Sequence, residues 1–211
     1  TFGLNPKKDR IAQFAGIRTD AELNIIEPPV TLYCQPSIDY IPNPESLLIT
    51  GITLEECEEK GINEAEFSLL IKKHFSRPHT TILGYNTIRF DDEMIRYLFY
   101  RNFIDPYAHT WQHNNSRWDL LDVVRATFAL RPDGICWPTS STNANKNDEP
   151  QTISLRLEDL TKANNLHHEK AHDALSDVYA TLALAKLLRE KQPRLFNYFF
   201  QHRKAKTLKE T

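Results

Sequence analysis

The sequence contains few cysteines, and none of them forms a metal-binding pair. Cys34, Cys57 and Cys136 lie far apart, are odd in number and include no Cys-x-x-Cys spacing. Disulfide frameworks and structural zinc sites both need cysteines in closer and more regular groups. We therefore expect free thiols in a reducing compartment, which favours a cytoplasmic protein without a zinc site.

Long apolar runs and a strong net charge are also lacking. No segment approaches the ~18–20 apolar residues that a membrane helix needs, and the first residues do not resemble a signal peptide, so we expect no membrane association. The formal net charge is only −2. A nucleic-acid-binding protein with this charge must concentrate its basic residues locally, so the net charge neither supports nor excludes that function.

No internal repeat divides the 211 residues, a length that suits one hydrophobic core. Apolar alternation and short apolar runs predict strands at 11–18, 30–34 and 80–84, with a turn at 18–22 between the first two. Helical spacing predicts helices at about 54–59, 63–75, 92–103, 119–130, 156–164 and 172–191. This order implies an α/β protein, a mixed sheet flanked by helices. The polar segment 138–150 is predicted to be a solvated insert.

An acidic motif follows the predicted strand at 80–84. The segment Gly84-Tyr-Asn-Thr-Ile-Arg-Phe-Asp-Asp-Glu93 contains Asn-x3-Phe-Asp and places Asp91 beyond the end of that strand. Ligands of α/β folds gather at the carboxyl ends of strands, which makes Asp91 a candidate metal ligand. The simpler alternative is an acid that complements the dipole of the following helix.

A second motif, His-x4-Asp, ends at Asp177. The neighbours of Asp177 along the predicted helix are mostly apolar, so we expect its carboxylate to point into a covered region and to need a cation there. His172 precedes the helix and could accept a proton from an attacking water. Alternatively, Asp177 is an exposed acid of the first helical turn, and His172 is ordinary polar surface. The two motifs together indicate a nuclease site that holds two divalent ions about 4 Å apart.

Residues 85–137 are rich in arginines and aromatic residues, the combination that binds single-stranded nucleic acid. Arg125 falls between Leu121 and Phe128 on the predicted helix, inside its apolar sector, so it must find an anion or a packed partner. Trp111 lies in a polar segment without an evident core and is the best candidate for stacking on a base.

Several segments resemble the exonuclease I family of the DEDDh 3′→5′ exonuclease superfamily. They are Tyr85-Asn-x2-Arg-Phe-Asp-Asp-Glu93, Tyr100-Arg-Asn-Phe-x-Asp-Pro-Tyr107, Asn115-Ser-Arg-Trp-Asp-Leu-Leu-Asp122, Leu130-Arg-Pro-x-Gly134, Leu160-Thr-Lys-Ala-Asn164 and Ala171-His-Asp-Ala174. The resemblance covers the chain outside 138–150. It implies an RNase H-like fold and stepwise release of 5′-mononucleotides from the 3′ end of single-stranded DNA, with two Mg²⁺ ions for which Mn²⁺ could substitute.

The resemblance also implies roles for individual residues. Asp91 and Asp177 would bind the metal ions, and His172 would be the general base. The DNA-binding positions would be Thr1, Arg96, Tyr107, Trp111, Arg125 and Arg156. Arg131 and Tyr198 would bind the acidic, apolar tail of single-stranded DNA-binding protein. We expect a monomer in which 1–192 is the exonuclease domain and 193–211 is a helix and linker toward further domains.

The chain departs from the family at its start. The family's first motif is Asp-aromatic-Glu-Thr-Phe-Gly, of which only Thr1-Phe2-Gly3 is present. Two of four metal-binding carboxylates and the first, central strand are therefore missing. We expect a fragment truncated at both ends, with little or no activity by itself.

Three other interpretations remain open at this point. The chain could be an RNA-directed exonuclease of the same superfamily. It could instead be a non-catalytic module that docks single-stranded DNA or a protein, which the missing acids favour. A structural α/β domain with chance matches is the third, and the number of matching segments argues against it.

Overall fold

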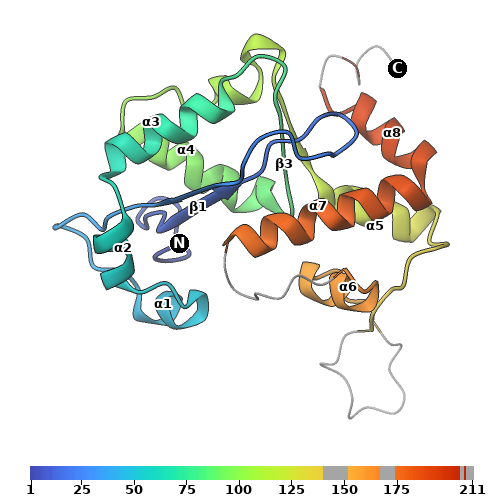
Figure 1. Ribbon diagram of the computed structural model, residues 1–211, viewed down its shortest axis with the longest axis horizontal. Coiled ribbons are helices and arrows are strands. Elements are labelled where there is room, and N and C mark those ends of the chain that lie inside the picture. The colour runs from blue at the N-terminus through green and yellow to red at the C-terminus, as the bar shows by residue number, and fades with distance from the viewer. Residues whose placement is uncertain (140–151, 167–173, 205–206, 208–211) are drawn as a thin grey trace.

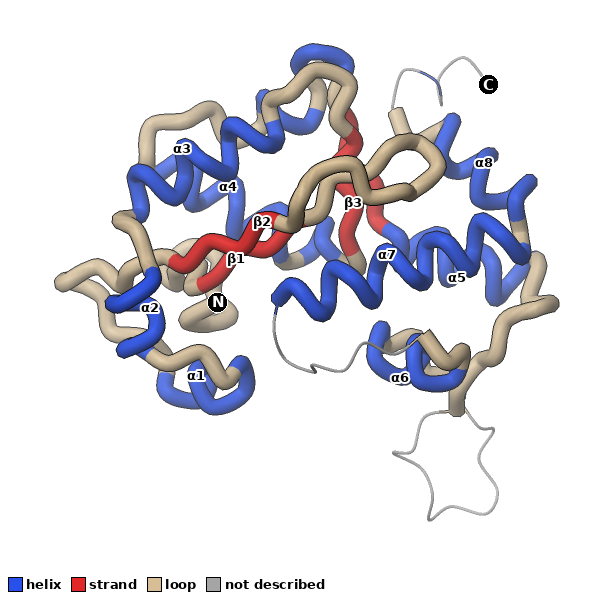
Figure 2. Tube along the Cα trace, in the orientation of Figure 1, coloured by secondary structure: helices blue, strands red, loops and turns tan. Residues whose placement is uncertain are grey.

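The strands form two small sheets in the part of the chain that the structure describes. The structure is a computed structural model, and it describes residues 1–139, 152–166, 174–204 and 207. Strand β1 (Gln13–Gly16) pairs antiparallel with β2 (Val30–Tyr33), and β3 (Thr81–Gly84) pairs parallel with β4 (Ser116–Asp119). Figure 2 shows the β1–β2 hairpin and β3 running in different directions.

Helices cover these strands in two groups, which Figure 1 shows on opposite sides of the molecule. The first group is α3 (Glu64–Phe75) and α4 (Asp91–Arg101). The second contains α5 (Leu120–Leu130), α6 (Leu157–Ala163), α7 (Ala174–Lys191) and α8 (Pro193–Gln201). Two shorter helices, α1 (Pro44–Thr50) and α2 (Leu54–Lys60), lie beside the N-terminal segment.

Each group of helices has its own hydrophobic core. The larger core joins α5, α6, α7 and α8 to β4, where the indole of Trp118 meets the ring of Phe196 edge-on at 5.0 Å between centroids. The second core packs α3 and α4 against the hairpin, with Phe67, Leu98 and Phe99 fully buried. A small third cluster contains the fully buried Phe2 together with Ala12, Ile52 and Cys57 of α2.

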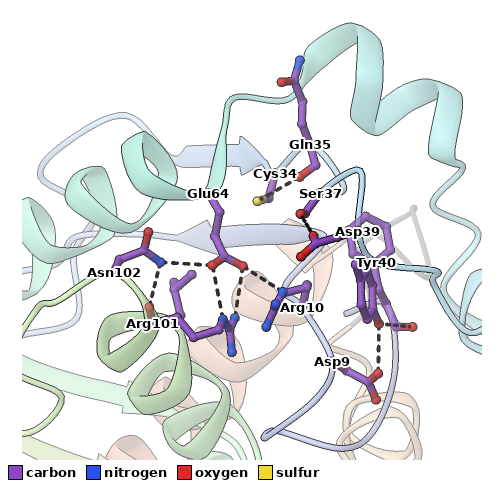
Figure 3. A network of polar contacts seen from close by, with 12 residues as sticks. Asp9, Arg10, Cys34, Gln35, Ser37, Asp39, Tyr40, Glu64, Arg101 and Asn102 are labelled. Atoms are coloured by element: carbon purple, nitrogen blue, oxygen red, sulfur yellow. Dashed lines mark hydrogen bonds and ion pairs between the residues drawn. The ribbon is translucent and has the colours of Figure 1, made fainter.

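Polar contacts fasten the N-terminal segment to the second core (Figure 3). Glu64, at the start of α3, accepts hydrogen bonds from Arg101 Nε at 3.2 Å and from Asn102 Nδ2 at 3.1 Å, and its other oxygen lies 3.5 Å from Arg10 Nε. The same carboxylate therefore ties the segment before β1 to the ends of two helices.

The α/β class is confirmed, and most predicted elements are present within one or two residues of their predicted bounds. Side chains that cap helix N-termini explain the agreement, because Thr53, Asn63 and Asp119 each accept a backbone N–H of the helix that follows. Among the α-helices and strands that the structure describes, α1 and β4 were not predicted. The predicted insert 138–150 lies mostly outside the described residues, as do residues 172 and 173 of the last predicted long helix.

None of the described helices combines the length and the apolar character that crossing a bilayer requires. Cys34 and Cys57 are buried, Cys136 is exposed, and all three thiols are free, as expected.

Candidate active site

A cavity of about 1410 Å³ lies between the two sheets. Every residue of β1 and of β3 lines it, and α7 contributes Asp177 to its wall. The start of α4 contributes Asp91, and Thr1 lies on the same wall. The structure therefore brings both predicted metal-binding carboxylates to one cavity, although they are far apart in sequence.

The loop between β3 and α4 determines where Asp91 lies. Asn86 has a left-handed backbone with φ of 58°, and residues 87–89 form a single 3₁₀ turn before α4 begins at Asp91. Asp119, at the end of β4, accepts hydrogen bonds from the backbone N–H groups of Asn86 at 2.8 Å and Ile88 at 3.1 Å. From the sequence, Asp119 was expected at a helix start and without a role in the site.

The environment of Asp91 disfavours its charged form. Its carboxyl is accessible to solvent, but it lies in a concave wall where protein atoms displace bulk water. This desolvation raises the pKa of Asp91 to about 6, and the negative charges of Asp92 and Asp119 act in the same direction. Asp92 is compensated by Arg117, whose Nη1 lies 2.6 Å from its Oδ2. The N-terminal ammonium of Thr1 acts in the opposite direction and lowers the pKa of Asp91, which shows that a cation beside this carboxylate stabilises its charged form.

Asp177 is exposed on the cavity wall, so the expectation of a covered carboxylate is wrong. Only the later part of α7 is buried, through residues such as Leu184 and Leu188, while the first turns face the cavity. Apolar neighbours further along the helix therefore do not cover Asp177. His172 lies outside the described residues.

The carboxylates suit a divalent metal ion in their chemistry, because Mg²⁺ and Mn²⁺ prefer oxygen ligands. Among the residues that the structure describes, no three His, Cys, Asp or Glu side chains are grouped closely enough to hold a metal. The described part of the site thus supplies Asp91 and Asp177 from different elements.

Arginines accompany these acids in the cavity. Arg125 and Arg156 both line it, and both are exposed. Arg125 was expected inside the apolar sector of its helix, which is wrong, because α5 buries Leu121, Val124 and Thr127 and turns position 125 outward. It does find an anion, since its Nη1 lies 3.1 Å from Asp122 Oδ1.

Besides Thr1, Arg125 and Arg156, the predicted DNA-binding residues do not line this cavity. The guanidinium of Arg96 forms an ion pair with Glu93 and lies over the ring of Tyr107, 5.1 Å from its centroid. Tyr107 is 56% exposed, and Trp111 is 63% exposed, as expected of a residue without a core around it. We call the two exposed rings, together with the half-buried Arg96 that lies over Tyr107, the Tyr107–Trp111 surface.

Arg131 and Tyr198 lie together at a second, smaller cavity of about 470 Å³. It is formed where α5 ends and α8 begins, and Leu130, Arg194 and Leu195 complete its wall with Gln192 and Pro193. This cavity combines two cations with apolar side chains.

The chain belongs to the exonuclease family, whose sequence profile matches residues 1–185. Within that family its relatives include two proteins named exodeoxyribonuclease I. The Haemophilus influenzae protein is 56% identical over 210 residues, which are 100% of this chain and 43% of that protein. The Escherichia coli protein is 58% identical over 203 residues, 96% of this chain and 41% of that protein. The chain thus spans less than half the length of these relatives.

Solved structures give the same result. The structure of E. coli exonuclease I in complex with a dA16 oligonucleotide superimposes with a TM-score of 0.91 at 55% identity, over 99% of this chain and 43% of that one. Other matching structures show a zinc-bound form of the E. coli enzyme with single-stranded DNA, and an SSB/exonuclease I crystal with an inhibitor. The α/β arrangement is therefore the RNase H-like exonuclease fold.

Proposed function

We propose that the complete gene product carrying this chain degrades single-stranded DNA from its 3′ end and releases 5′-mononucleotides, as part of DNA repair. One observation carries this proposal: Asp91, Asp177, Arg125 and Arg156 all line the same cavity. Carboxylates that can hold metal ions and arginines that can hold phosphates therefore line one space. The exonuclease family and the oligonucleotide complex of a relative agree with it.

Asp91 and Asp177 would hold two Mg²⁺ ions, for which Mn²⁺ can substitute. When bound, these ions supply positive charge that stabilises the transition state of phosphodiester hydrolysis. His172 would take a proton from the water whose oxygen attacks phosphorus, while the bond from phosphorus to the 3′ oxygen breaks. The leaving 3′ oxygen then receives a proton, which yields a 5′-mononucleotide and a shortened strand.

The remaining residues would hold the strand. Arg125 and Arg156 would bind phosphates near the cavity, with Thr1 at its wall. On the Tyr107–Trp111 surface the two exposed rings would stack on bases, and Arg96 would support the ring of Tyr107. Phosphate contacts and base stacking of this kind hold single strands without reading their sequence.

Digestion of end-labelled oligonucleotides tests this function. With Mg²⁺, a 5′-labelled single strand should give a ladder that shortens from the 3′ end, and a chelator should stop the reaction. Asp91→Asn and Asp177→Asn should each lower the rate about 100-fold or more, because each removes a ligand of the metal ions whose positive charge stabilises the transition state. Glu190→Gln, an exposed change on the same helix as Asp177, should leave the rate unchanged.

A matched RNA oligonucleotide separates DNA-directed from RNA-directed digestion. Faster digestion of RNA would assign the chain to an RNA-directed exonuclease. Binding of the DNA without any metal-dependent digestion by the complete gene product would make it a docking module instead.

We further propose that the Arg131–Tyr198 cavity binds the acidic, apolar C-terminal tail of single-stranded DNA-binding protein. Its two arginines can pair with carboxylates, and its apolar wall can cover an apolar side chain. A fluorescent peptide with that tail should bind, and Arg131→Ala should weaken its binding about tenfold. Lys186→Ala, on the exposed face of α7, should have no effect.

The proposal includes the organisation of the chain. Residues 1–192, with the insert 138–150, would form the exonuclease domain, and 193–211 would lead toward further domains. The protein would work as a monomer in the reducing cytoplasm, in agreement with its free buried thiols. Sedimentation velocity tests the monomer.

A further inference from the structure

Asp119 is a buried carboxylate whose two oxygens accept hydrogen bonds from three backbone N–H groups. Only 6% of the residue is exposed. Its Oδ1 accepts the N–H groups of Asn86 at 2.8 Å and Leu121 at 3.0 Å, and its Oδ2 accepts that of Ile88 at 3.1 Å. Within the described ranges, no Lys, Arg or His forms a salt bridge with it. Both oxygens therefore hold two backbone segments in place, one at the start of α5 and one in the loop before α4.

One of these bonds is an ordinary helix cap, and the other two are not. The bond to Leu121 satisfies a free N–H in the first turn of α5, as an N-cap residue does. The bonds to Asn86 and Ile88 contribute nothing to α5. They bind the loop that crosses from β3 to α4, next to the position where Gly84 and Asp119 pair across the two strands.

That loop is short and tightly turned. Asn86 has a left-handed backbone, and a Cβ on Gly84 would come within 2.1 Å of the Thr87 methyl group. Two residues separate Ile88 from Asp91, so an amide fixed at position 88 also fixes where α4 and its first carboxylate begin. Without these bonds, the N–H groups of Asn86 and Ile88 would lose their acceptor, the buried carboxylate would lose two of its three donors, and the turn would lose its anchor.

We infer that Asp119 is a positioning residue that holds the 85–90 loop and thereby sets the place of the Asp91 carboxylate in the cavity. The inference rests on the proposed role of Asp91 as a metal ligand. Asp119 itself acts through the backbone, in the way that outer groups orient the ligands of metal sites.

Asp119→Asn tests this role with little change of shape. The amide keeps one acceptor oxygen and points an NH₂ group at a backbone N–H, so at least one of the three bonds is lost. We expect amide hydrogen exchange at Asn86 and Ile88 to become at least tenfold faster. Mn²⁺ affinity, measured by calorimetry, should weaken about tenfold or more. Asp20→Asn is the matched control, because Asp20 accepts the N–H groups of Glu22 and Asn24 in a turn outside the 85–90 loop.

Asp119→Ser separates positioning from capping. A serine can still cap α5 but cannot reach both loop amides. Asp119→Ser should therefore keep the part of the thermal stability that comes from the helix cap, while its Mn²⁺ affinity stays below that of the unmodified protein. A Mn²⁺ affinity in Asp119→Ser equal to that of the unmodified protein would overturn the inference, since a helix cap alone would then be sufficient to form the metal site. Unchanged exchange at Asn86 and Ile88 in Asp119→Asn would overturn it as well.

Asp91→Asn shows which proposal has failed if a result is negative. If that change weakens Mn²⁺ binding and Asp119→Asn does not, the positioning role is wrong and the metal site stands. If Asp91→Asn leaves Mn²⁺ binding unchanged, the metal-binding role of Asp91 is wrong, and the positioning of Asp91 as a ligand falls with it. The exchange rates then report only on the loop.

Discussion

His109 is a buried imidazole between two aromatic rings. It stacks on Phe75 with ring centroids 5.6 Å apart and meets Phe99 edge-on at 5.3 Å, and within the described residues its Nδ1 has no hydrogen-bond partner. Burial lowers the pKa of His109 to about 4, with Arg96 and Arg117 acting in the same direction and Asp105 against them. The folded state therefore holds the neutral imidazole more strongly than the unfolded chain does.

This makes stability depend on pH in a defined window. Because the pKa of His109 is lower in the folded state than in the unfolded chain, its contribution to the unfolding free energy is complete above pH about 6.5, the pKa in the unfolded chain. That contribution is lost as the pH falls toward 4. The loss should reach on the order of 3 kcal/mol. His109→Phe keeps the ring packing and removes the titration. Denaturant unfolding of both proteins from pH 7 to 4 should show a shallower decline for the variant, and parallel curves would contradict this.

Gly84 is the residue that lets the 85–90 loop turn so closely. In Gly84→Ala the added methyl group would meet Thr87 Cγ2 at 2.1 Å, so we expect a loss of about 1–3 kcal/mol of unfolding free energy. Thr87→Ser removes that methyl group and should restore most of the loss in the double variant. A double-mutant cycle by thermal or denaturant unfolding measures the coupling, and additive losses would show that the contact is not the cause.

The acidic residues of the site show which properties of a single residue can be predicted from the sequence. Asp91 and Asp177 could be located because each lies in a short local motif. The exposure of Asp177 could not be predicted, because it depends on which segments pack against the first turns of α7. The outward position of Arg125 likewise follows from the rotation of α5 in its core.

Among the elements, α3 and α4 are joined by the carboxylate of Glu64. It contacts Arg101 from α4 and Arg10 from the segment before β1, and its side chain is 22% exposed. Glu64→Ala leaves these arginines without their anion, so the unfolding free energy should fall by about 2 kcal/mol. Lys60→Ala, which removes an exposed pair with Glu56, should cost less than about 1 kcal/mol. Equal losses in the two variants would contradict a special role for the Glu64 contacts.

Helices were the most predictable elements, because capping residues mark where several of them begin in the sequence. The strand β4 was not predicted, since Ser-Arg-Trp-Asp is too short and polar to read as a buried strand by alternation. Its pairing with β3 supplies the evidence that was lacking, because the register brings Trp118 beside Leu83 on one face. The helix α1 did carry a signal, Asn43 followed by Pro44, which favours a helix start.

At the scale of the whole molecule, net charge and local charge differ. The formal charge of −2 gives no general attraction for DNA, yet Arg125 and Arg156 face the main cavity and Arg96 lies at the Tyr107–Trp111 surface. Binding should therefore depend on a few phosphate contacts. Such contacts release counterions, so affinity for a single strand should fall with salt at a logarithmic slope of about −0.7 for each phosphate.

The slope distinguishes a phosphate contact from a packing role for Arg125. Three arginine contacts predict a slope of about −2, and Arg125→Ala should make it shallower by about 0.7. Fluorescence anisotropy of a labelled single strand, with a chelator to prevent digestion, measures it over a range of salt concentrations. Lys186→Ala should leave the slope unchanged. If Arg125→Ala weakened binding at every salt concentration equally, Arg125 would act through its pair with Asp122 on α5, and the phosphates would be held by other residues.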